Sequence, residues 1–357
     1  MATTALDPDA LNQYSFAVWS YKQGEMVSML IHIGDELGLF AALADSGAVT
    51  SEALAASTEL NERFLREWLM GMAAAKLVTL HDDHTFELPP EGAAILADET
   101  NSIRFSAGAF RGGVDQPQLD MILDSFRTGK GMSYQDQGPK AAAGLARMTG
   151  PFSRISLLPT ILPALDGVVA KLEAGGSVLD VGCGGGVTSC IIAEAFPDAR
   201  VVGYDPSEIA VSQANARATE AGLSNVSFVV AGAADVPAGS DFDLVLTFDC
   251  LHDMPRPDES LAAIRAAIAA NGTLLIKDIR STGDFKRDRR NPLLALFYGF
   301  SVTSCLQSAM SEPDGLGLGT LGLHGDMARD MTAASGFGSF HQHDFDDNAN
   351  LYYEVRP

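Results

Sequence analysis

Two short segments of the chain carry residue types that could do chemistry. His252 and Asp253 lie just beyond the largely apolar run Phe242–Phe248, and a histidine is neutral enough near pH 7 to accept a proton from a hydroxyl group. Further upstream, the apolar run Val178–Val181 leads into four glycines and Cys183. Glycine lets the backbone approach a ligand closely, and the start of the next helix can face that ligand. The first segment therefore predicts acid–base chemistry, and the second predicts a cofactor-binding loop.

The glycine loop differs from the dinucleotide-binding fingerprint. That fingerprint has a further glycine three residues after Gly184, where this chain has Val187. Asp180 lies two residues before Gly182, in a position where a carboxylate could hold a cationic group. Asp205 ends the next apolar run, where an acidic residue of a doubly wound sheet accepts ribose hydroxyls. Capping of the following helix is the alternative role for Asp205.

Alternating strands and helices must position these residues. From residue 177 onward, β-type runs alternate with helical segments of ten or more residues, which predicts a parallel, doubly wound, Rossmann-like α/β sheet. Two final β-type runs, residues 337–345 and 350–357, flank a short turn and predict an antiparallel last strand. Ligands of such sheets collect beyond the carboxyl ends of the strands, so the two candidate segments are expected at the same edge.

The N-terminal part of the chain predicts a mainly α-helical winged-helix domain. Residues 1–20 are expected to form a loosely held arm. Three helical segments follow, at residues 24–43, 51–57 and 61–77, and a β-hairpin turns at residues 81–84. The third helix is expected to expose an apolar set suited to a partner helix, namely Phe64, Leu65, Trp68, Leu69 and Met70.

These patterns divide the chain into three expected parts. Residues 1–105 form the winged-helix domain, for which we expect a dimerisation role. Residues 106–164 form a helical connector that lines a cleft, and residues 165–357 form the cofactor-binding domain. Lid helices are expected as an insertion at about residues 285–325, and we interpret the apolar stretch 291–310 within it as one or two buried or lid helices.

Composition limits the classes of partner and compartment. The 357 residues include 24 basic and 46 acidic side chains, and the net charge of −22 disfavours nucleic acid and anionic membranes. Four scattered cysteines without a CxxC pair predict a reducing, cytoplasmic setting, and the N-terminus lacks the pattern of a secretory signal. His341 and His343 alternate along one strand, but no third ligand of suitable spacing is evident, so we predict no metal site.

The chain resembles the class I S-adenosylmethionine (SAM)-dependent methyltransferases. Its segments VLDVGCGGG, VVGYDPS, FVVAGAADVP, FDLVLTFDCLHDM and GTLLIKD follow the order and spacing of that family. The third strand of the family usually ends in Gly-Asp-Ala, whereas this chain has Ala231-Gly-Ala, so the adenine contact would pass to the backbone and to Asp235. The resemblance implies SAM as the cofactor, bound by Asp180, Gly182, Gly184, Gly186, Asp205, Pro206, Gly232, Ala233, Asp235, Phe248 and Asp249.

A similar His-Asp pair occurs in winged-helix small-molecule O-methyltransferases, in which the histidine is the base and the winged domain forms a homodimer. This likeness implies that His252 and Asp253 are catalytic and that the acceptor is a small, apolar or aromatic hydroxyl compound. Those enzymes often carry Lys-Trp where this chain has Phe248-Asp249. Residues 1–100 hold four basic and sixteen acidic side chains, which favours dimerisation over DNA binding. Two alternatives stay open: a SAM-sensing winged-helix transcriptional regulator without catalytic activity, and N- or C-methyl transfer with a structural His252.

Overall fold

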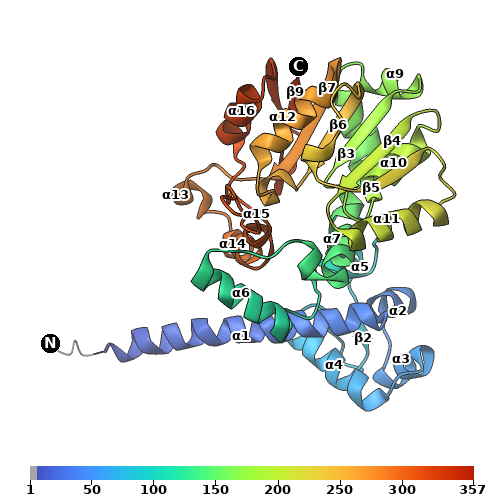
Figure 1. The fold of residues 1–357 in the computed structure, drawn as a ribbon. Helices are drawn as coiled ribbons and strands as arrows, with labels where there is room; N and C mark the ends of the chain where they lie inside the picture. The colour runs from blue at the N-terminus through green and yellow to red at the C-terminus, as the bar shows by residue number, and fades with distance from the viewer. Residues whose placement is uncertain (1–5) are drawn as a thin grey trace. The chain divides into compact units, whose positions relative to one another are not determined.

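The computed structural model describes residues 6–357, which divide into two compact units (Figure 1). The first unit ends at Gly113, and the second runs from Val114 to Pro357. Each unit has its own apolar core.

The first unit has the winged-helix order that the sequence predicts. Helices α2, α3 and α4 precede a two-stranded antiparallel hairpin in which Thr79 pairs with Glu87. A short bridge from Val49 to Phe86 ties the hairpin to the chain before α3. The elements are α1 (Pro8–Glu36), α2 (Leu39–Ser46), α3 (Ser51–Thr58), α4 (Glu62–Ala74), β1 (Thr79–Leu80), β2 (Phe86–Glu87) and α5 (Pro90–Leu96).

Helix α1 shows that the prediction of a loosely held arm was wrong from Pro8 onward; residues 1–5 of that arm lie outside the described residues. The carboxylate of Asp7 accepts hydrogen bonds from the N–H groups of Asp9 and Ala10, and proline occupies the first helical turn. Both features start a helix, because the first N–H groups of a helix have no partner within it. The capped helix runs for 29 residues and ends at Glu36, so the segment 24–43, predicted as one helix, is divided between α1 and α2 at Gly38, which has a φ of 66°.

Helix α4 also differs from expectation in what it exposes. Leu65, Trp68 and Leu69 are buried in the core of their own unit, and the Trp68 indole N–H donates to the carbonyl of Leu30 at 2.8 Å. On α4, Phe64 and Met70 remain exposed, at 80% and 50%. The core of a small domain needs the apolar face of its central helix, so less of that face is left for a partner than the sequence suggested.

The second unit begins with helices that precede the sheet. The long segment α7 passes directly into a stretch of π-helix, which contains Pro159, and then into two short helices. The elements are α6 (Gln116–Thr128), α7 (Pro139–Phe152), the π-helical stretch Ser153–Ile161, α8 (Leu162–Ala164) and α9 (Val168–Glu173).

A seven-stranded sheet follows, in the spatial order β5-β4-β3-β6-β7-β9-β8. The first five strands of that order pair in parallel, and β9 joins β7 antiparallel, which confirms the predicted doubly wound sheet with an antiparallel finish. Helix α12 ends at Ala267, because β7 begins at Ile268, which pairs with Phe242. The strands are β3 (Ser177–Val181), β4 (Arg200–Asp205), β5 (Val226–Val230), β6 (Phe242–Phe248), β7 (Ile268–Ile279), β8 (Ser339–His343) and β9 (Asn350–Arg356).

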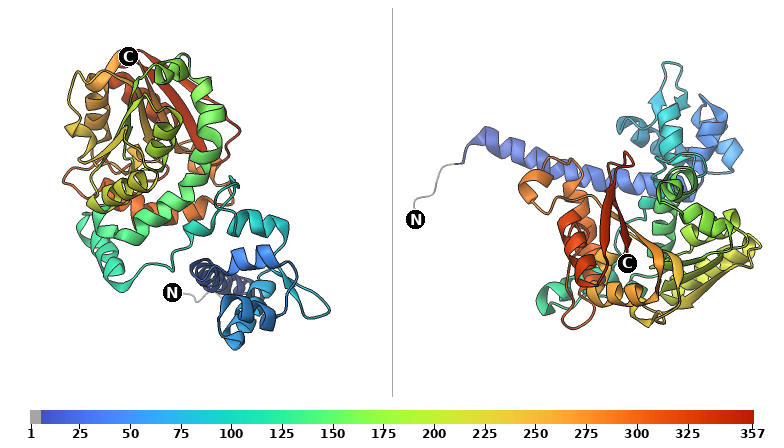
Figure 2. Two further views of the ribbon diagram at one scale, coloured as in Figure 1. Left: turned by 90° about the vertical axis from the view of Figure 1, so that its right-hand side faces the viewer. Right: turned by 90° about the horizontal axis from the view of Figure 1, so that it is seen from above.

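Helices cover both faces of this sheet (Figure 2). Leu179 and Val245 pack into one core with residues of α12 and α16, whereas Val178 and Leu244 pack into another with residues of α10 and the π-helical stretch. Burial on both faces explains why these strands are almost continuously apolar. The flanking helices are α10 (Val187–Ala195), α11 (Glu208–Glu220), α12 (Pro257–Ala267) and α16 (Gly325–Ala334).

The apolar stretch 291–310 is helical, as predicted. It forms α14 (Leu294–Phe300), one π-helical turn (Ser301–Cys305) and α15 (Leu306–Ala309), after the short helix α13 (Phe285–Asp288). Among the described residues, no single helix has the length and apolar character needed to cross a membrane; α1 and α2 together pass that test by composition, but they are bent by 73°.

Candidate active site

The glycine loop joins β3 to α10 at the carboxyl edge of the sheet. Gly182, Gly184 and Gly186 all have positive φ, which residues with a side chain rarely adopt. A Cβ atom at Gly186 would lie 2.7 Å from that of Ala214, so this position needs glycine for packing. A Cβ atom at Gly184 would meet no atom of the described residues within 4 Å. The loop is therefore packed at its end and open at Gly184, where a ligand can approach the backbone.

Asp180 lies on β3 with its side chain on the α10 side of the sheet. It is buried, and the Ser189 hydroxyl on α10 donates to its Oδ2 atom at 2.5 Å. Burial, together with the nearby charge of Asp205, raises the pKa of the Asp180 carboxyl to about 7. The raised pKa indicates that no cationic side chain of the described residues stabilises the ionised form of this buried carboxyl. A cationic group of a ligand placed beside it would therefore be stabilised.

Asp205 ends β4 and is tied to the glycine loop. Its Oδ2 atom accepts from the Gly184 N–H at 2.9 Å, and its Oδ1 atom accepts from the Ser207 N–H at 2.8 Å. Burial raises the pKa of this carboxyl above its usual value. The alternative role as cap of α11 falls to Ser207, whose hydroxyl accepts from the Ala210 N–H. Pro206 separates the two, and each oxygen of Asp205 retains a lone pair for a ribose hydroxyl.

The end of β5 lies next to Asp205. The Ala231 N–H donates to the Asp205 carbonyl at 3.1 Å, and the following single turn of 3-10 helix contains Ala233 and Asp235. The Asp235 carboxylate accepts from the Gly232 N–H at 2.9 Å. This carboxylate thus shapes the turn where the adenine contact is expected.

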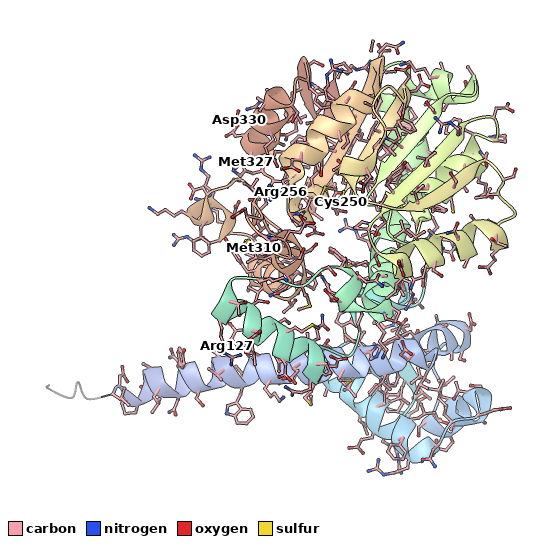
Figure 3. All side chains as sticks on the ribbon, viewed as in Figure 1. Arg127, Cys250, Arg256, Met310, Met327 and Asp330 are labelled. Carbon is pink, nitrogen blue, oxygen red and sulfur yellow. The ribbon has the colours of Figure 1, made fainter. Side chains whose placement is uncertain are left out.

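Phe248 ends β6, which pairs with β3 on the side opposite β4, and Asp249 follows it. The Asp249 carboxylate binds the Lys277 ammonium group and accepts from the Asn350 side-chain amide at 2.6 Å. Asp249 has a φ of 52°, and this turn precedes Cys250, whose thiol donates to the Val181 carbonyl at 3.2 Å. Cys250, labelled in Figure 3, also lies 2.7 Å from the position of a Cβ atom on Gly182. The glycine loop and the segment that carries His252 are therefore in contact.

His252 lies in the turn after β6 and is buried between two carboxylates. Its Nδ1 atom is 2.7 Å from Oδ1 of Asp278 on β7, and its Nε2 atom is 3.1 Å from Oδ1 of Asp253. The Tyr134 hydroxyl donates to the other oxygen of Asp253 at 2.7 Å. Burial disfavours the charged ring, but Asp253 and Asp278 outweigh it and raise the pKa of His252 well above 6.5.

Two of these partners, Asp278 and Tyr134, were not identified from the sequence. Asp278 ends the fifth parallel strand in the segment GTLLIKD, and an acidic residue at a carboxyl strand end is a signal that could have identified it. Tyr134 comes from the helical connector, and no sequence pattern marks it.

The chain between α6 and α7 lies against the helical segment after β7 and against the start of α11. The Gly131 N–H donates to the Met310 carbonyl at 2.8 Å, and the Ser304 hydroxyl donates to the Gln137 side chain (Figure 3 labels Met310). The Gln135 side-chain carbonyl accepts from the Ser207 hydroxyl at 2.9 Å. This connector therefore contacts both the helical segment after β7 and the start of α11.

Comparison with known proteins agrees with this architecture. Residues 172–301 match the family described as Methyltransferase domain, and residues 25–98 match the Rv2258c-like winged HTH domain. The chain is 26% identical over 287 residues to demethylspheroidene O-methyltransferase of Cereibacter sphaeroides, an alignment that covers 75% of this chain and 71% of that one. Six further methyltransferases match over 105 to 156 residues, and the chain spans 39% to 63% of their length.

Solved structures show the same fold over the whole chain. Human N-acetylserotonin methyltransferase in complex with SAM superposes with a TM-score of 0.68 at 17% identity, covering 100% of this chain and 99% of that one. An O-methyltransferase from neocarzinostatin biosynthesis, in complex with S-adenosylhomocysteine and 1,4-dihydroxy-2-naphthoic acid, superposes with a TM-score of 0.57 at 16% identity, covering 92% and 95%. Residues 25–98 thus match an Rv2258c-like winged helix-turn-helix domain, residues 172–301 match a methyltransferase domain, and the fold is shared with methyltransferases whose structures hold SAM or S-adenosylhomocysteine.

Proposed function

We propose that this protein transfers a methyl group from SAM to the hydroxyl oxygen of a small, apolar or aromatic compound, with His252 as the general base. One observation carries the proposal: the turn that holds His252 contacts the glycine loop through Cys250, at the carboxyl edge of the sheet. A base there is close to the group that a bound cofactor would present. The O-methyltransferases among the similar proteins support the choice of oxygen as the acceptor atom.

The residues of the cofactor loop fit SAM. The backbone is open at Gly184, Asp205 can accept ribose hydroxyls, and the buried Asp180 lacks the positive charge that an ammonium group supplies. SAM supplies, when bound, a methyl group on a positively charged sulfur. The acceptor oxygen would attack that methyl carbon as the carbon–sulfur bond breaks, and the electron pair of that bond would stay on sulfur as a neutral thioether.

His252 would take the proton that the hydroxyl group loses. Its Nδ1 side faces Asp278, so a ring with hydrogen on Nδ1 would offer the lone pair of Nε2 to the acceptor. Asp278 would act as a positioning residue, because it fixes the ring orientation and stabilises the imidazolium that forms. Asp253, held by Tyr134, would lie beside the proton-accepting nitrogen. Positioning of the acceptor and exclusion of water would supply the remaining rate enhancement, since methyl transfer needs no covalent intermediate with the protein.

An apolar acceptor is favoured by the insertion after β7. Phe297 and Phe300 on α14 are half-buried, and Tyr298 between them is more exposed. Aromatic side chains of this kind suit a flat apolar ligand. The neighbour with bound 1,4-dihydroxy-2-naphthoic acid is an example of such a ligand in the same fold.

We also propose that the protein is a homodimer held by the first unit. Phe16 and Trp19 on α1 are 77% and 69% exposed, and Ile31 and Gly34 are the residues that the helix buries in its own unit. A second copy of the helix would cover this apolar length, which is too large to stay in water without a partner. DNA is a poor alternative partner, because the two arginines of α4, Arg63 and Arg66, already form ion pairs with Glu67 and Glu62.

Kinetics of His252→Ala test the base role. Formation of S-adenosylhomocysteine is measured against a panel of phenols and hydroxyquinones, so the assay does not depend on which acceptor is natural. We expect turnover to fall by about 10²–10⁴-fold with cofactor affinity nearly unchanged, because general-base help is of that size.

His343→Ala is the matched control, since His343 is also paired with a carboxylate, Glu354, but lies on β8. Unfolding of both variants is followed alongside, because His252→Ala leaves two buried carboxylates without the imidazole. Near-normal turnover of folded His252→Ala would remove the base assignment.

A further inference from the structure

A third group with metal-binding chemistry lies beside His252 and Asp253. The π-helical turn at the end of α14 brings Cys305 to this place, and one ligand atom from each of the three residues lies within 4.8 Å of the others. The three residues are 2%, 6% and 9% exposed, in the order His252, Asp253, Cys305. A histidine, a carboxylate and a cysteine thus converge in a buried place, although 52 residues separate Asp253 from Cys305 along the chain.

The free atoms of these residues point to a missing ligand. Nδ1 of His252 is held by Asp278, so Nε2 is the ring atom left for a ligand. Oδ1 of Asp253 is buried, lies 3.1 Å from Nε2 of His252 and accepts no further hydrogen bond from the described residues, although its other oxygen accepts from Tyr134. Two of the three candidate ligands therefore already have the outer hydrogen-bond partners that orient the ligands of metal sites.

The set of donor atoms selects the class of cation. A nitrogen, a thiolate sulfur and one carboxylate oxygen suit Zn²⁺ and similar borderline-soft cations, whereas Mg²⁺ and Ca²⁺ prefer oxygen alone. Tetrahedral zinc with these ligands separates the ligand atoms by roughly 3.3–3.8 Å. The observed separations, up to 4.8 Å, need a closure of about 1.5 Å at most. A dication would also offset the charge of Asp253 and Asp278, which otherwise share a single imidazole.

We propose that Nε2 of His252, a carboxylate oxygen of Asp253 and the thiolate of Cys305 bind a divalent cation of the Zn²⁺ type. Binding displaces the thiol proton of Cys305 and, when the imidazole is charged, the proton on Nε2; both are released to solvent. The cation occupies the Nε2 lone pair, so it blocks proton acceptance by His252. This last consequence rests on the proposed function, whereas the binding site itself does not.

Titration with Co²⁺ tests the site in the full-length protein without any methyl acceptor. Cobalt stands in for zinc, and a thiolate ligand gives it a charge-transfer absorption that oxygen and nitrogen ligands do not give. We expect that band in the wild type and its loss in Cys305→Ser. Affinity for Zn²⁺, measured by competition, should fall by more than about 100-fold, since loss of an outer partner alone costs 10–100-fold.

Cys190→Ser is the matched control, because Cys190 is a similarly buried cysteine on α10 and should leave the cobalt spectrum unchanged. Binding of S-adenosylhomocysteine shows that each variant is folded, and Cys305→Ala serves as a second variant should the serine disturb the lid. A wild type without the charge-transfer band, or a Cys305→Ser protein with wild-type zinc affinity, overturns the proposal.

The two proposals fail separately. If cobalt binds as expected but His252→Ala turns over at the wild-type rate, the base role is wrong and the metal site stands. If His252→Ala loses turnover but the wild type shows no thiolate–cobalt band, the metal site is wrong and the base role stands.

Discussion

Replacement of Asp180 by asparagine tests the charge balance of the cofactor site. The pKa of the Asp180 carboxyl is raised from 3.8 to about 7, chiefly by burial and further by Asp205, while the Ser189 hydrogen bond opposes the rise. A difference of this size corresponds to about 4 kcal/mol, which is the order of the cost of ionising the group in the folded protein. Asparagine keeps an oxygen that can accept from Ser189 but carries no charge.

The sign of the effect follows from the raised pKa. Below about pH 4 the Asp180 carboxyl is protonated in both the folded and the unfolded protein, and its contribution to folding stability is fully present. As pH rises from about 4 to 7, the carboxyl ionises more readily in the unfolded protein, so this contribution to the free energy of unfolding is lost. Cofactor-free Asp180→Asn protein should therefore gain stability relative to the wild type across this range, by up to about 4 kcal/mol at pH 8. Urea unfolding of both proteins between pH 4 and 8.5 measures the difference, and effects of other titrating groups cancel.

The Asp180→Asn substitution should weaken ligand binding, although it raises the stability of the cofactor-free protein. The ammonium group of S-adenosylhomocysteine would bind the ionised carboxylate, so affinity in the wild type rises with pH toward about 7 and a proton is released on binding below that. Asp180→Asn should bind more weakly by about 1.5–3 kcal/mol, the range for hydrogen bonds to charged groups, and without this pH dependence. A stability difference that is flat with pH, or calorimetry that gives wild-type affinity for the variant, would refute the reasoning.

Three further outcomes are expected. Asp205→Ala should weaken binding of S-adenosylhomocysteine by about 1.5–3 kcal/mol in calorimetry, and an unchanged affinity would remove the ribose assignment. Turnover of the wild type should rise with pH to a midpoint well above 6.5, because only neutral His252 accepts a proton; a rate that is level from pH 6 to 9 would argue against a histidine base. Light scattering at micromolar concentration should report a dimer that Phe16→Glu combined with Trp19→Glu converts to a monomer, and a monomeric wild type would contradict the α1 interface.

Local patterns predicted much of the fold. The alternation of apolar strands with helices of ten or more residues gives the parallel sheet, because each pattern has its own period and needs few distant contacts to be recognised. The positive φ of Gly182, Gly184 and Gly186 is likewise a local property of the loop after β3. The helix order and the β-hairpin of the first unit could be read in the same way, apart from the start of α1.

Contacts between distant segments could not be read from such patterns. The partners of His252 and Asp253 come from β7, from the connector and from the lid, as Asp278, Tyr134 and Cys305. The prediction of exposed apolar residues on α4 was wrong for a related reason. Periodicity shows which face of a helix is apolar, but only packing decides how much of that face is buried in the core of the helix's own unit.

The sequence by itself determined the type of most elements, because local patterns and backbone preferences set them. It also determined that the glycine loop and His252 meet at one edge of the sheet, because both follow the carboxyl ends of parallel strands. Only the tertiary structure decided the ionisation of the site. Burial, and then Asp205 25 residues away, raise the pKa of Asp180, whereas the pKa of His252 is raised against burial by the adjacent Asp253 and by Asp278 26 residues away. Burial and the two distant carboxylates come from folding, because chain order does not specify which segments remove water from a charge or lie beside it.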